Sequence, residues 1–264
     1  MKDFNILLDV VKEAGQRAWE LQREVVREYK HDGSILTKAD LEINKTLSDS
    51  IRSSFPEANI IAEELETPFY SGEEWTFTID PIDGTDSYSQ GMAGWCVAVG
   101  IHDRELLPVG GIVSAPRWGT DPEEGLFIYR LPNGENGITG GDIQTGAQLP
   151  HATSLMVGSK VHRRYDYSSF PGKIRSIGSS ILHALSPFIH SDTAGAFLDP
   201  SFIWDISPAH GIVRSRGVEV IYPDGEELTY RTMVHRRRSD HHILVTKTGK
   251  AGYIMGHFTR REHP

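Results

Sequence analysis

The stretch TIDPIDGTDSY, from Thr78 to Tyr88, gathers acidic side chains in one place. Asp80, Asp83 and Asp86 lie within seven residues of a chain whose formal net charge is −9. Like charges this close repel one another, so a fold that keeps them together needs a counter-charge. An acidic surface turn is the simplest interpretation, and a turn that binds cations is the alternative.

The local sequence favours a cation-binding turn. WTFTID reads as a strand that ends at Asp80, and Pro81 forces a turn because it has no N–H to donate. Asp83 follows three residues after Asp80, so the two carboxylates can converge on one point, as Mg²⁺ or Mn²⁺ ligands do. Gly84 can take a positive φ, and the N–H groups of Gly84 and Thr85 can face an anion. Carboxylates beside an anion site need cations between them, which indicates phosphate chemistry.

Two other places supply carboxylates. Glu63 and Glu64 follow the apolar run NIIA, so at least one of them projects from the end of a strand. Asp205 follows Trp204 at the start of an expected helix, with Pro208 in its first turn. An exposed glutamate pair and a helix-capping aspartate are the structural alternatives. Taken together with the DPIDGT turn, these carboxylates favour a metal site over the two structural alternatives.

The first half of the chain reads as helices followed by strands. Apolar residues at helical spacing predict an amphipathic helix over residues 4–26, and Ile43, Leu47 and Ile51 predict a second that ends near Phe55. Short β-rich runs follow: ANIIAEE, EWTFTID, WCVAVGI, LLPVGGIVSA and GLFIYRL. Asn133-Gly134 predicts a hairpin turn, with a return strand after it.

The second half alternates strands and helices. LMVGS and VEVIY read as strands, and SSILHALSPFIH and WDISPAHGIVRSR as helices. The region 132–150, rich in Gly and Pro, is the best candidate for a boundary. We therefore expect two α/β subdomains, at residues 1–145 and 146–264, with helices covering their sheets.

Composition excludes several classes of protein. No apolar run approaches the ~18 residues that span a bilayer, and acidic residues interrupt the apolar N-terminus, unlike a secretory signal. Cys96 is the only cysteine, which favours a reducing, cytoplasmic location. The acidic balance argues against a nucleic acid polymer or a membrane as partner. The basic segment His235–His242 reads as a solvated loop, with contact to an anion as the alternative.

Three motifs resemble the signatures of one family. AEE (Ala62–Glu64), DPIDGT (Asp80–Thr85) and WD (Trp204-Asp205) resemble those of the inositol monophosphatase family, in order and in spacing, from LTKAD (36–40) to about Tyr222. Its members are magnesium-dependent, lithium-sensitive phosphomonoesterases, among them fructose-bisphosphatases and 3′(2′),5′-bisphosphate nucleotidases. The resemblance implies a layered αβαβα sandwich of two subdomains, often a homodimer.

The resemblance also implies roles for individual residues. The implied cofactor is Mg²⁺, as two or three ions with Mn²⁺ as a possible substitute, and its implied ligands are Glu64, Asp80, Asp83, Asp205 and the carbonyl of Ile82. Asp40 and Thr85 are implied to orient the attacking water, with Glu64 also in the catalytic set. The implied substrate contacts are Asp83, Gly84, Thr85, Gly178, Ser179, Ser180 and Asp205.

The chain departs from the family pattern near the substrate. The acidic residue common seven positions before the WD aspartate is replaced by Leu198, with Asp199 beside it. IGSS and FIWDISPAHGIV look closer to the bisphosphate nucleotidases. Asp86 falls outside the ligand positions. It either faces the substrate's leaving group and disfavours a second phosphate there, or caps the helix that follows Thr85.

A small phosphorylated metabolite, such as inositol monophosphate or a related polyol or sugar phosphate, is thus the expected substrate. 3′-Phosphoadenosine 5′-phosphate is the alternative. A catalytically silent binding protein of the same fold would be expected to lose a metal carboxylate, and none is lost. A zinc hydrolase would need histidines at helical spacing, whereas His241 and His242 are adjacent. Cys96 lies in an apolar strand and reads as a core residue.

Overall fold

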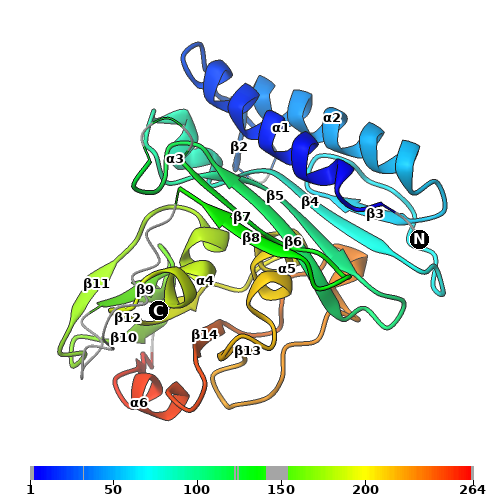
Figure 1. The fold of residues 1–264 in the computed structure, drawn as a ribbon. Coiled ribbons are helices and arrows are strands. Elements are labelled where there is room, and N and C mark those ends of the chain that lie inside the picture. Colours follow the sequence, from blue (N-terminus) through cyan, green and yellow to red (C-terminus); the bar gives the residue numbers. More distant parts are fainter. Residues whose placement is uncertain (1–2, 32, 122, 124, 141–153, 263–264) are drawn as a thin grey trace.

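The computed structural model describes residues 3–31, 33–121, 123, 125–140 and 154–262, and in them the chain forms five layers (Figure 1). Helices α1 (Ile6–Gln22) and α2 (Lys38–Ser54) cover the outer face of a six-stranded sheet. Helices α4 (Ser180–Ile189) and α5 (Ile203–Val213) separate it from a five-stranded sheet. The short helix α6 (Ala251–Met255) lies against β14 of the second sheet. The expected layered αβαβα sandwich is confirmed.

The six-stranded sheet has the order β3-β4-β5-β6-β7-β8. Only β3 and β4 pair in parallel, and the other neighbours are antiparallel. The hairpin predicted at Asn133-Gly134 joins β7 to β8, and Gly134 has the φ of 91° that this turn demands. The strands are β3 (Asn59–Ala62), β4 (Thr76–Asp83), β5 (Cys96–His102), β6 (Pro108–Ala115), β7 (Leu126–Arg130) and β8 (Asn136–Thr139).

One predicted strand end is wrong. β4 does not stop at Asp80 but continues through Pro81 to Asp83. Asp80 pairs with Ala98 and Asp83 with Cys96, so β4 has one residue more than β5 between these pairs. Pro81 has no N–H for the ladder, so pairing is interrupted there and resumes beyond the irregularity. The two aspartates therefore project from a kinked but still paired strand.

The five-stranded sheet has the order β11-β9-β12-β14-β13. β9, β11 and β12 are parallel, and β14 runs against both of its neighbours. The domain boundary expected at residues 145/146 lies outside the described residues. The strands are β9 (Ser154–Val157), β11 (Lys173–Arg175), β12 (Thr193–Leu198), β13 (Val218–Ile221) and β14 (Ile243–Lys247).

Four short strands and a short helix complete the fold. Each pair of strands forms a two-stranded antiparallel ribbon, β1 with β2 and β10 with β15. Helix α3 follows β4 after Gly84 and begins at Thr85, the last residue of DPIDGT. These elements are β1 (Glu28–Tyr29), β2 (Ile35–Leu36), β10 (Tyr165–Asp166), β15 (Thr259–Arg260) and α3 (Thr85–Ser89).

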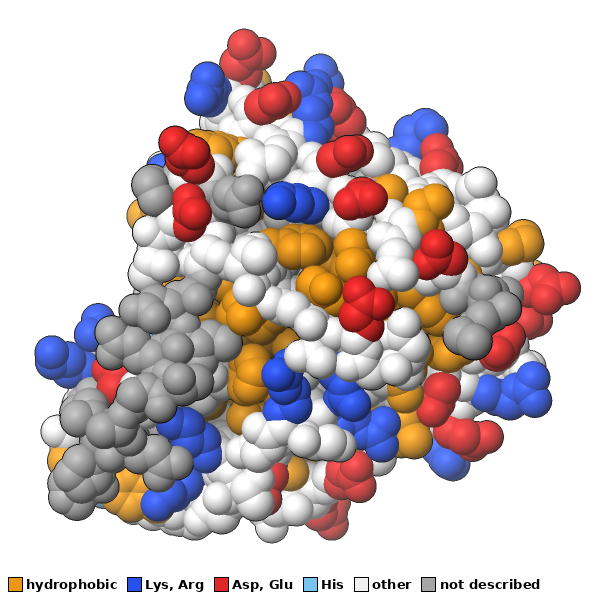
Figure 2. All heavy atoms as spheres, viewed as in Figure 1, with side chains coloured by type: hydrophobic (Ala, Val, Ile, Leu, Met, Phe, Trp, Pro, Cys, Tyr) orange, Lys and Arg blue, Asp and Glu red, His pale blue; other side chains and the backbone are white. Residues whose placement is uncertain are grey.

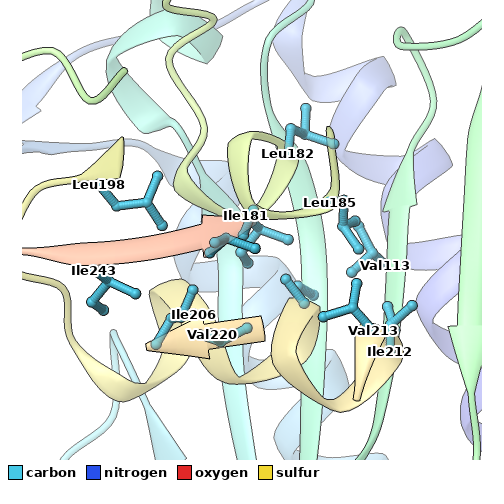
Figure 3. Close-up of a cluster of buried hydrophobic side chains, with 14 of the residues drawn as sticks. Val113, Ile181, Leu182, Leu185, Leu198, Ile206, Ile212, Val213, Val220 and Ile243 are labelled. Atoms are coloured by element: carbon cyan, nitrogen blue, oxygen red, sulfur yellow. The ribbon is translucent and has the colours of Figure 1, made fainter. Parts of the chain in front are cut away.

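The middle helical layer is apolar toward both sheets (Figure 3). Val113 of β6, Leu185 of α4, Ile212 of α5 and Val220 of β13 are all buried in one cluster. Burial of each such side chain stabilises the fold by roughly 1.5–3 kcal/mol. Because α5 is held from both sides, the first turn of α5, which carries Asp205, is fixed relative to the first sheet.

The outer surface mixes charges of both signs. Figure 2 shows acidic and basic side chains interspersed over one face, with apolar side chains gathered across its middle. Among the described residues, no helix combines the length and the apolar character that crossing a membrane requires.

Candidate metal centre

Three carboxylates from two parts of the fold meet at one point. Asp80 and Asp83 project from the kinked end of β4, and Asp205 from the first turn of α5. One oxygen of each can be chosen so that the three lie within 4.8 Å of one another. The sequence places Asp205 more than 120 residues from the others, so the sandwich itself builds this cluster.

The cluster is electrostatically unfavourable without a counter-charge. Burial, followed by the charges of the neighbouring acidic groups, raises the pKa of Asp80 well above its ordinary value. Burial and the charge of Asp83 raise the pKa of Asp205 to about 8. Burial raises the pKa of Asp83 to about 6, against hydrogen bonds from Ser179 and Ile181 that lower it. The anionic forms of all three carboxylates therefore gain from a cation among them.

The available oxygens fit a hard divalent cation. Oδ1 of Asp80 is buried and has no hydrogen-bond partner among the described residues. Oδ2 of Asp83 accepts from the Ser179 hydroxyl and, at 2.7 Å, from the Ile181 N–H, while Oδ2 of Asp205 accepts from the Phe202 N–H at 2.7 Å. These bonds orient the carboxylates and leave their other oxygens for a ligand. An all-oxygen set of this kind suits Mg²⁺ or Mn²⁺.

The glutamates after β3 lie beside this cluster. Lys30 Nζ forms an ion pair with Glu63 Oε1 at 2.9 Å and a second with Glu64. Burial raises the pKa of Glu63 to about 7, against the charge of Lys30. The charge of Glu63 in turn raises the pKa of both Asp80 and Asp205. Of the two glutamates, Glu63 is the one whose charge acts on Asp80 and Asp205, whereas Glu64 is the one predicted from the sequence as a metal ligand.

Strand pairing explains the position of Glu63. Its N–H donates to the carbonyl of Ile79 at 3.1 Å, one of the hydrogen bonds of the parallel pair Ala62–Ile79 at the end of β3. In the register that pairs Ala62 with Ile79, the next position along β3 and β4 places Glu63 beside Asp80. Glu64 pairs with Lys30, and its charge raises the pKa of Asp40, to a smaller extent than burial does. A ligand role for Glu64 remains a prediction, and the geometry favours Glu63.

Asp40 and Thr85 lie together, as the resemblance implies. Thr85 Oγ1 lies 3.2 Å from Asp40 Oδ1 and 3.0 Å from the carbonyl oxygen of Ile82, and its single proton can be donated to either. Asp40 Oδ2 accepts from the Thr37 N–H at 2.8 Å and from its hydroxyl at 2.6 Å, at the start of α2. Burial raises the pKa of Asp40 to about 6. The pair can hold a water through one hydroxyl and one carboxylate.

Two glycines bring the loops of the two halves together. Gly84 has a φ of 92°, and a Cβ there would lie 2.8 Å from the carbonyl oxygen of Gly94 and 3.0 Å from that of Gly178. Gly178 also has a positive φ, of 97°. Any larger side chain at Gly84 would separate these loops. The DPIDGT turn and the loop before α4 therefore meet only because both positions are glycine.

Ser179 supports Asp83 from within this second loop. Its buried hydroxyl donates to Asp83 and accepts from the Leu182 N–H at 3.0 Å, which caps α4. Cys96 Sγ lies 3.7 Å behind it in the core, as expected of a core residue. We assign Ser179 to the positioning of Asp83. Contact of Gly178, Ser179 or Ser180 with a substrate stays a prediction.

Asp86, Leu198 and Asp199, which depart from the family pattern, have different surroundings in the structure. Asp86 is exposed in the first turn of α3, whose N-cap is Gly84, and no side-chain capping bond is formed there. Leu198 is a core residue. Asp199 Oδ2 accepts from the Lys160 N–H at 3.0 Å, and its Oδ1 lies 3.8 Å from His242 Nε2.

Two basic side chains that contact the Glu63–Glu64 turn were not predicted from the sequence. Lys30 pairs with both glutamates, but KHDG carries no motif that indicates this. Arg236, in the segment expected to be a solvated loop, donates to the carbonyls of Ala62 and Glu63. That expectation holds for the exposed Arg237 and is wrong for Arg236. Both contacts join segments far apart in the chain, so no local pattern reports them.

A model of the inositol monophosphatase family matches residues 4–247. The chain belongs to this family. Inositol monophosphatase 1 from Solanum lycopersicum is 24% identical over 248 residues, 83% of this chain and 85% of that protein. The 3′(2′),5′-bisphosphate nucleotidase CysQ from Aggregatibacter actinomycetemcomitans is 28% identical over 141 residues, and that match spans about half of each protein, 50% and 52%.

Solved structures of the inositol monophosphatase family share the fold. An IMPase/NADP phosphatase complexed with Mg²⁺ and phosphate superposes with a TM-score of 0.78 at 14% identity, over 98% of this chain and 95% of that one. The inositol monophosphatase family consists of metal-dependent phosphomonoesterases, and this member is a metal-dependent phosphoric monoester hydrolase.

Proposed function

We propose that the protein hydrolyses a small phosphomonoester, either an inositol monophosphate or a related polyol or sugar phosphate, with two or three Mg²⁺ ions that Mn²⁺ can replace. The observation that carries this proposal is the cluster of buried Asp80 and Asp83 with partly buried Asp205, in which one Asp80 oxygen has no hydrogen-bond partner among the described residues. Glu63 is the fourth carboxylate of the proposed ligand set, and the carbonyl oxygen of Ile82 is its fifth member.

The chain's own residues supply the positioning chemistry. The carboxylates of Asp80, Asp83 and Asp205 would hold Mg²⁺, which would supply charge neutralisation of the phosphate, a lowered pKa of a water and stabilisation of the leaving alkoxide. Thr85, when it donates to Asp40, has lone pairs free to accept a hydrogen bond from the attacking water. Asp40 is held by Thr37 and lies 3.2 Å from the Thr85 hydroxyl, so it is the residue that we propose to take up that water's proton. Water attacks phosphorus as it gives a proton to Asp40, the bond between phosphorus and the alcohol oxygen breaks, and the alkoxide takes a proton from solvent water and leaves as the alcohol, followed by inorganic phosphate.

Hydrolysis of 3′-phosphoadenosine 5′-phosphate is the second candidate. IGSS and FIWDISPAHGIV look closer to the bisphosphate nucleotidases, and relatives of that name match. Asp86 opposes this candidate only if its exposed carboxylate faces a second phosphate on the substrate, which is one of the two alternatives for that residue. A silent binding protein is disfavoured because each proposed carboxylate is present. Lithium sensitivity, a homodimer and a cytoplasmic location belong to the proposal as well.

One panel assay tests this function. Turnover of inositol 1-phosphate, 3′-phosphoadenosine 5′-phosphate and fructose 1,6-bisphosphate is measured with and without Mg²⁺, and phosphate release is quantified. We expect the monophosphate to give the largest kcat/KM, and D80N and D83N to lose most turnover because each removes a negative ligand. Near-normal activity of both variants across a Mg²⁺ titration would exclude the proposed centre, and preference for the adenosine bisphosphate would establish the second candidate.

A further inference from the structure

Arg236 reaches across the molecule to the turn that carries Glu63. Its Nη1 donates to the carbonyl oxygen of Ala62 at 2.6 Å and to that of Leu65 at 3.1 Å, and its Nη2 donates to that of Glu63 at 2.9 Å. One planar guanidinium thus satisfies three backbone acceptors of a single turn. Lys30 approaches the same turn from its carboxylate side. The turn is therefore held by a cation on each side.

The same guanidinium also contacts the segment that carries Asp205. The Arg236 Cζ atom lies 4.9 Å from the centroid of the Trp204 ring, directly before Asp205 in the chain. Trp204 stacks on Phe202 at 4.8 Å, and Arg238 lies 4.3 Å over the Phe202 ring. Arg238 further donates to the carbonyl of Pro200 at 2.7 Å. Two arginines of one segment therefore clamp the aromatic pair that precedes the α5 carboxylate.

The backbone of Arg236 is adapted to this contact. Its φ of 59° is in the left-handed region, which only a few non-glycine residues occupy. Such a conformation persists where the surrounding contacts determine it, as three hydrogen bonds and one ring contact do here. Its neighbour Arg237 is exposed and makes no hydrogen bond or ion pair within the described part of the chain. The segment is thus specialised at one position rather than uniformly basic.

We propose that Arg236 is a positioning residue that fixes Glu63 relative to Asp205, and thereby sets the affinity of the site for its divalent cation. The inference rests on the proposed metal centre. Glu63 comes from the first sheet and Asp205 from the helix after β12, and Arg236 contacts the carriers of both. Residues that orient metal ligands without touching the metal commonly change its affinity 10–100-fold when replaced.

The test measures Mn²⁺ binding to the full chain by electron paramagnetic resonance of free Mn²⁺, with R236K, R236M and R237M beside the wild type. We expect R236K and R236M to bind Mn²⁺ about tenfold more weakly, and R237M to bind as the wild type does. Lysine keeps the charge but cannot donate in a plane to three carbonyls or stack as guanidinium does. R236K also retains the best chance of folding, which circular dichroism checks.

Several results would overturn the inference. If folded R236K binds Mn²⁺ as tightly as the wild type does, the hydrogen bonds and ring contact of the guanidinium do not set the Mn²⁺ affinity, and the inference is wrong. If R237M loses as much Mn²⁺ affinity as the Arg236 variants do, the loss comes from the removal of any positive charge in this segment and not from the contacts of Arg236. At saturating Mg²⁺, the kcat of R236K should return to near the wild-type value, since every carboxylate is still present; a kcat that stays low contradicts positioning of the metal. If the wild type itself fails to bind Mn²⁺, the metal centre is absent and the proposed function fails with it.

Discussion

Lys30 Nζ and Glu63 Oε1 form an ion pair of 2.9 Å at the edge of the aspartate cluster. The lysine belongs to the segment between β1 and β2, and a second carboxylate, that of Glu64, pairs with the same ammonium. In the metal-free protein this ammonium is the nearest counter-charge to the two glutamates. A cation in the proposed metal centre would therefore stabilise the Glu63 carboxylate as the Lys30 ammonium does.

The first prediction follows from that shared task. K30M should lower the free energy of unfolding of the metal-free protein by about 1 kcal/mol, a figure reduced for the partial exposure of the pair. With Mg²⁺ present the loss should shrink, because the cation replaces the missing charge. Urea unfolding in EDTA and in Mg²⁺ measures both. K45M, which breaks an exposed pair with Asp49, is the matched control and should change little in either condition. An equal loss with and without Mg²⁺ would contradict the shared role.

The second prediction separates the two glutamates. E63Q should raise the Mg²⁺ concentration needed for half-maximal activity by about tenfold or more, since its charge acts on Asp80 and Asp205. E64Q should change it by less than about threefold, because Glu63, and not Glu64, is the glutamate whose charge raises the pKa of Asp80 and Asp205. Parallel Mg²⁺ titrations of kcat/KM compare the pair directly. A larger effect from E64Q would restore the assignment made from the sequence.

These glutamates show where prediction from sequence ends. The aspartates of the DPIDGT turn and the strands around it could be predicted, because their spacing and periodicity are local. Which glutamate faces the cluster depends on the pairing of β3 with β4, which no local pattern reports. The same holds for Lys30 and Arg236, whose partners lie on other elements, and for the continuation of β4 past Pro81. Contacts between segments far apart in the chain, and not local propensity, determine the position of Glu63, the partners of Lys30 and Arg236, and the end of β4.

The third prediction concerns acid stability, through two buried histidines behind the site. His102 Nε2 has no partner within the described residues, and His210 Nδ1 lies 2.9 Å from the Tyr230 hydroxyl. Burial lowers the pKa of His102 to about 4 and that of His210 to about 3. Both are neutral when folded, whereas an unfolded histidine titrates near 6.5. Their contribution to stability is therefore fully present above pH 6.5 and is lost as the pH falls toward 4 and then 3.

The measurement is urea unfolding at pH 7.5 and pH 5. Each histidine should contribute a loss of roughly 1.4 kcal/mol per pH unit below 6.5. H102F removes one titrating group and should make stability less dependent on pH, whatever its effect at pH 7.5. H162Q, at an exposed histidine, is the control and should keep the wild-type slope. A pH dependence unaltered in H102F would show that the acid lability comes from other groups.

The last prediction concerns Asp86, whose charge the metal centre does not explain. The capping alternative has no hydrogen bond in its favour, since Gly84 is the N-cap of α3 and no side chain caps it. A carboxylate in a first helical turn still gains from the helix dipole, and D86N would forfeit only that. If Asp86 instead repels a second phosphate on the substrate, D86N should raise kcat/KM for a bisphosphate relative to a monophosphate by about threefold to tenfold, for ~1 kcal/mol of repulsion relieved. Because the side chain is exposed, that gain should diminish as the salt concentration rises. A ratio that D86N leaves unchanged at low salt would assign Asp86 to the helix dipole and remove it from substrate selection.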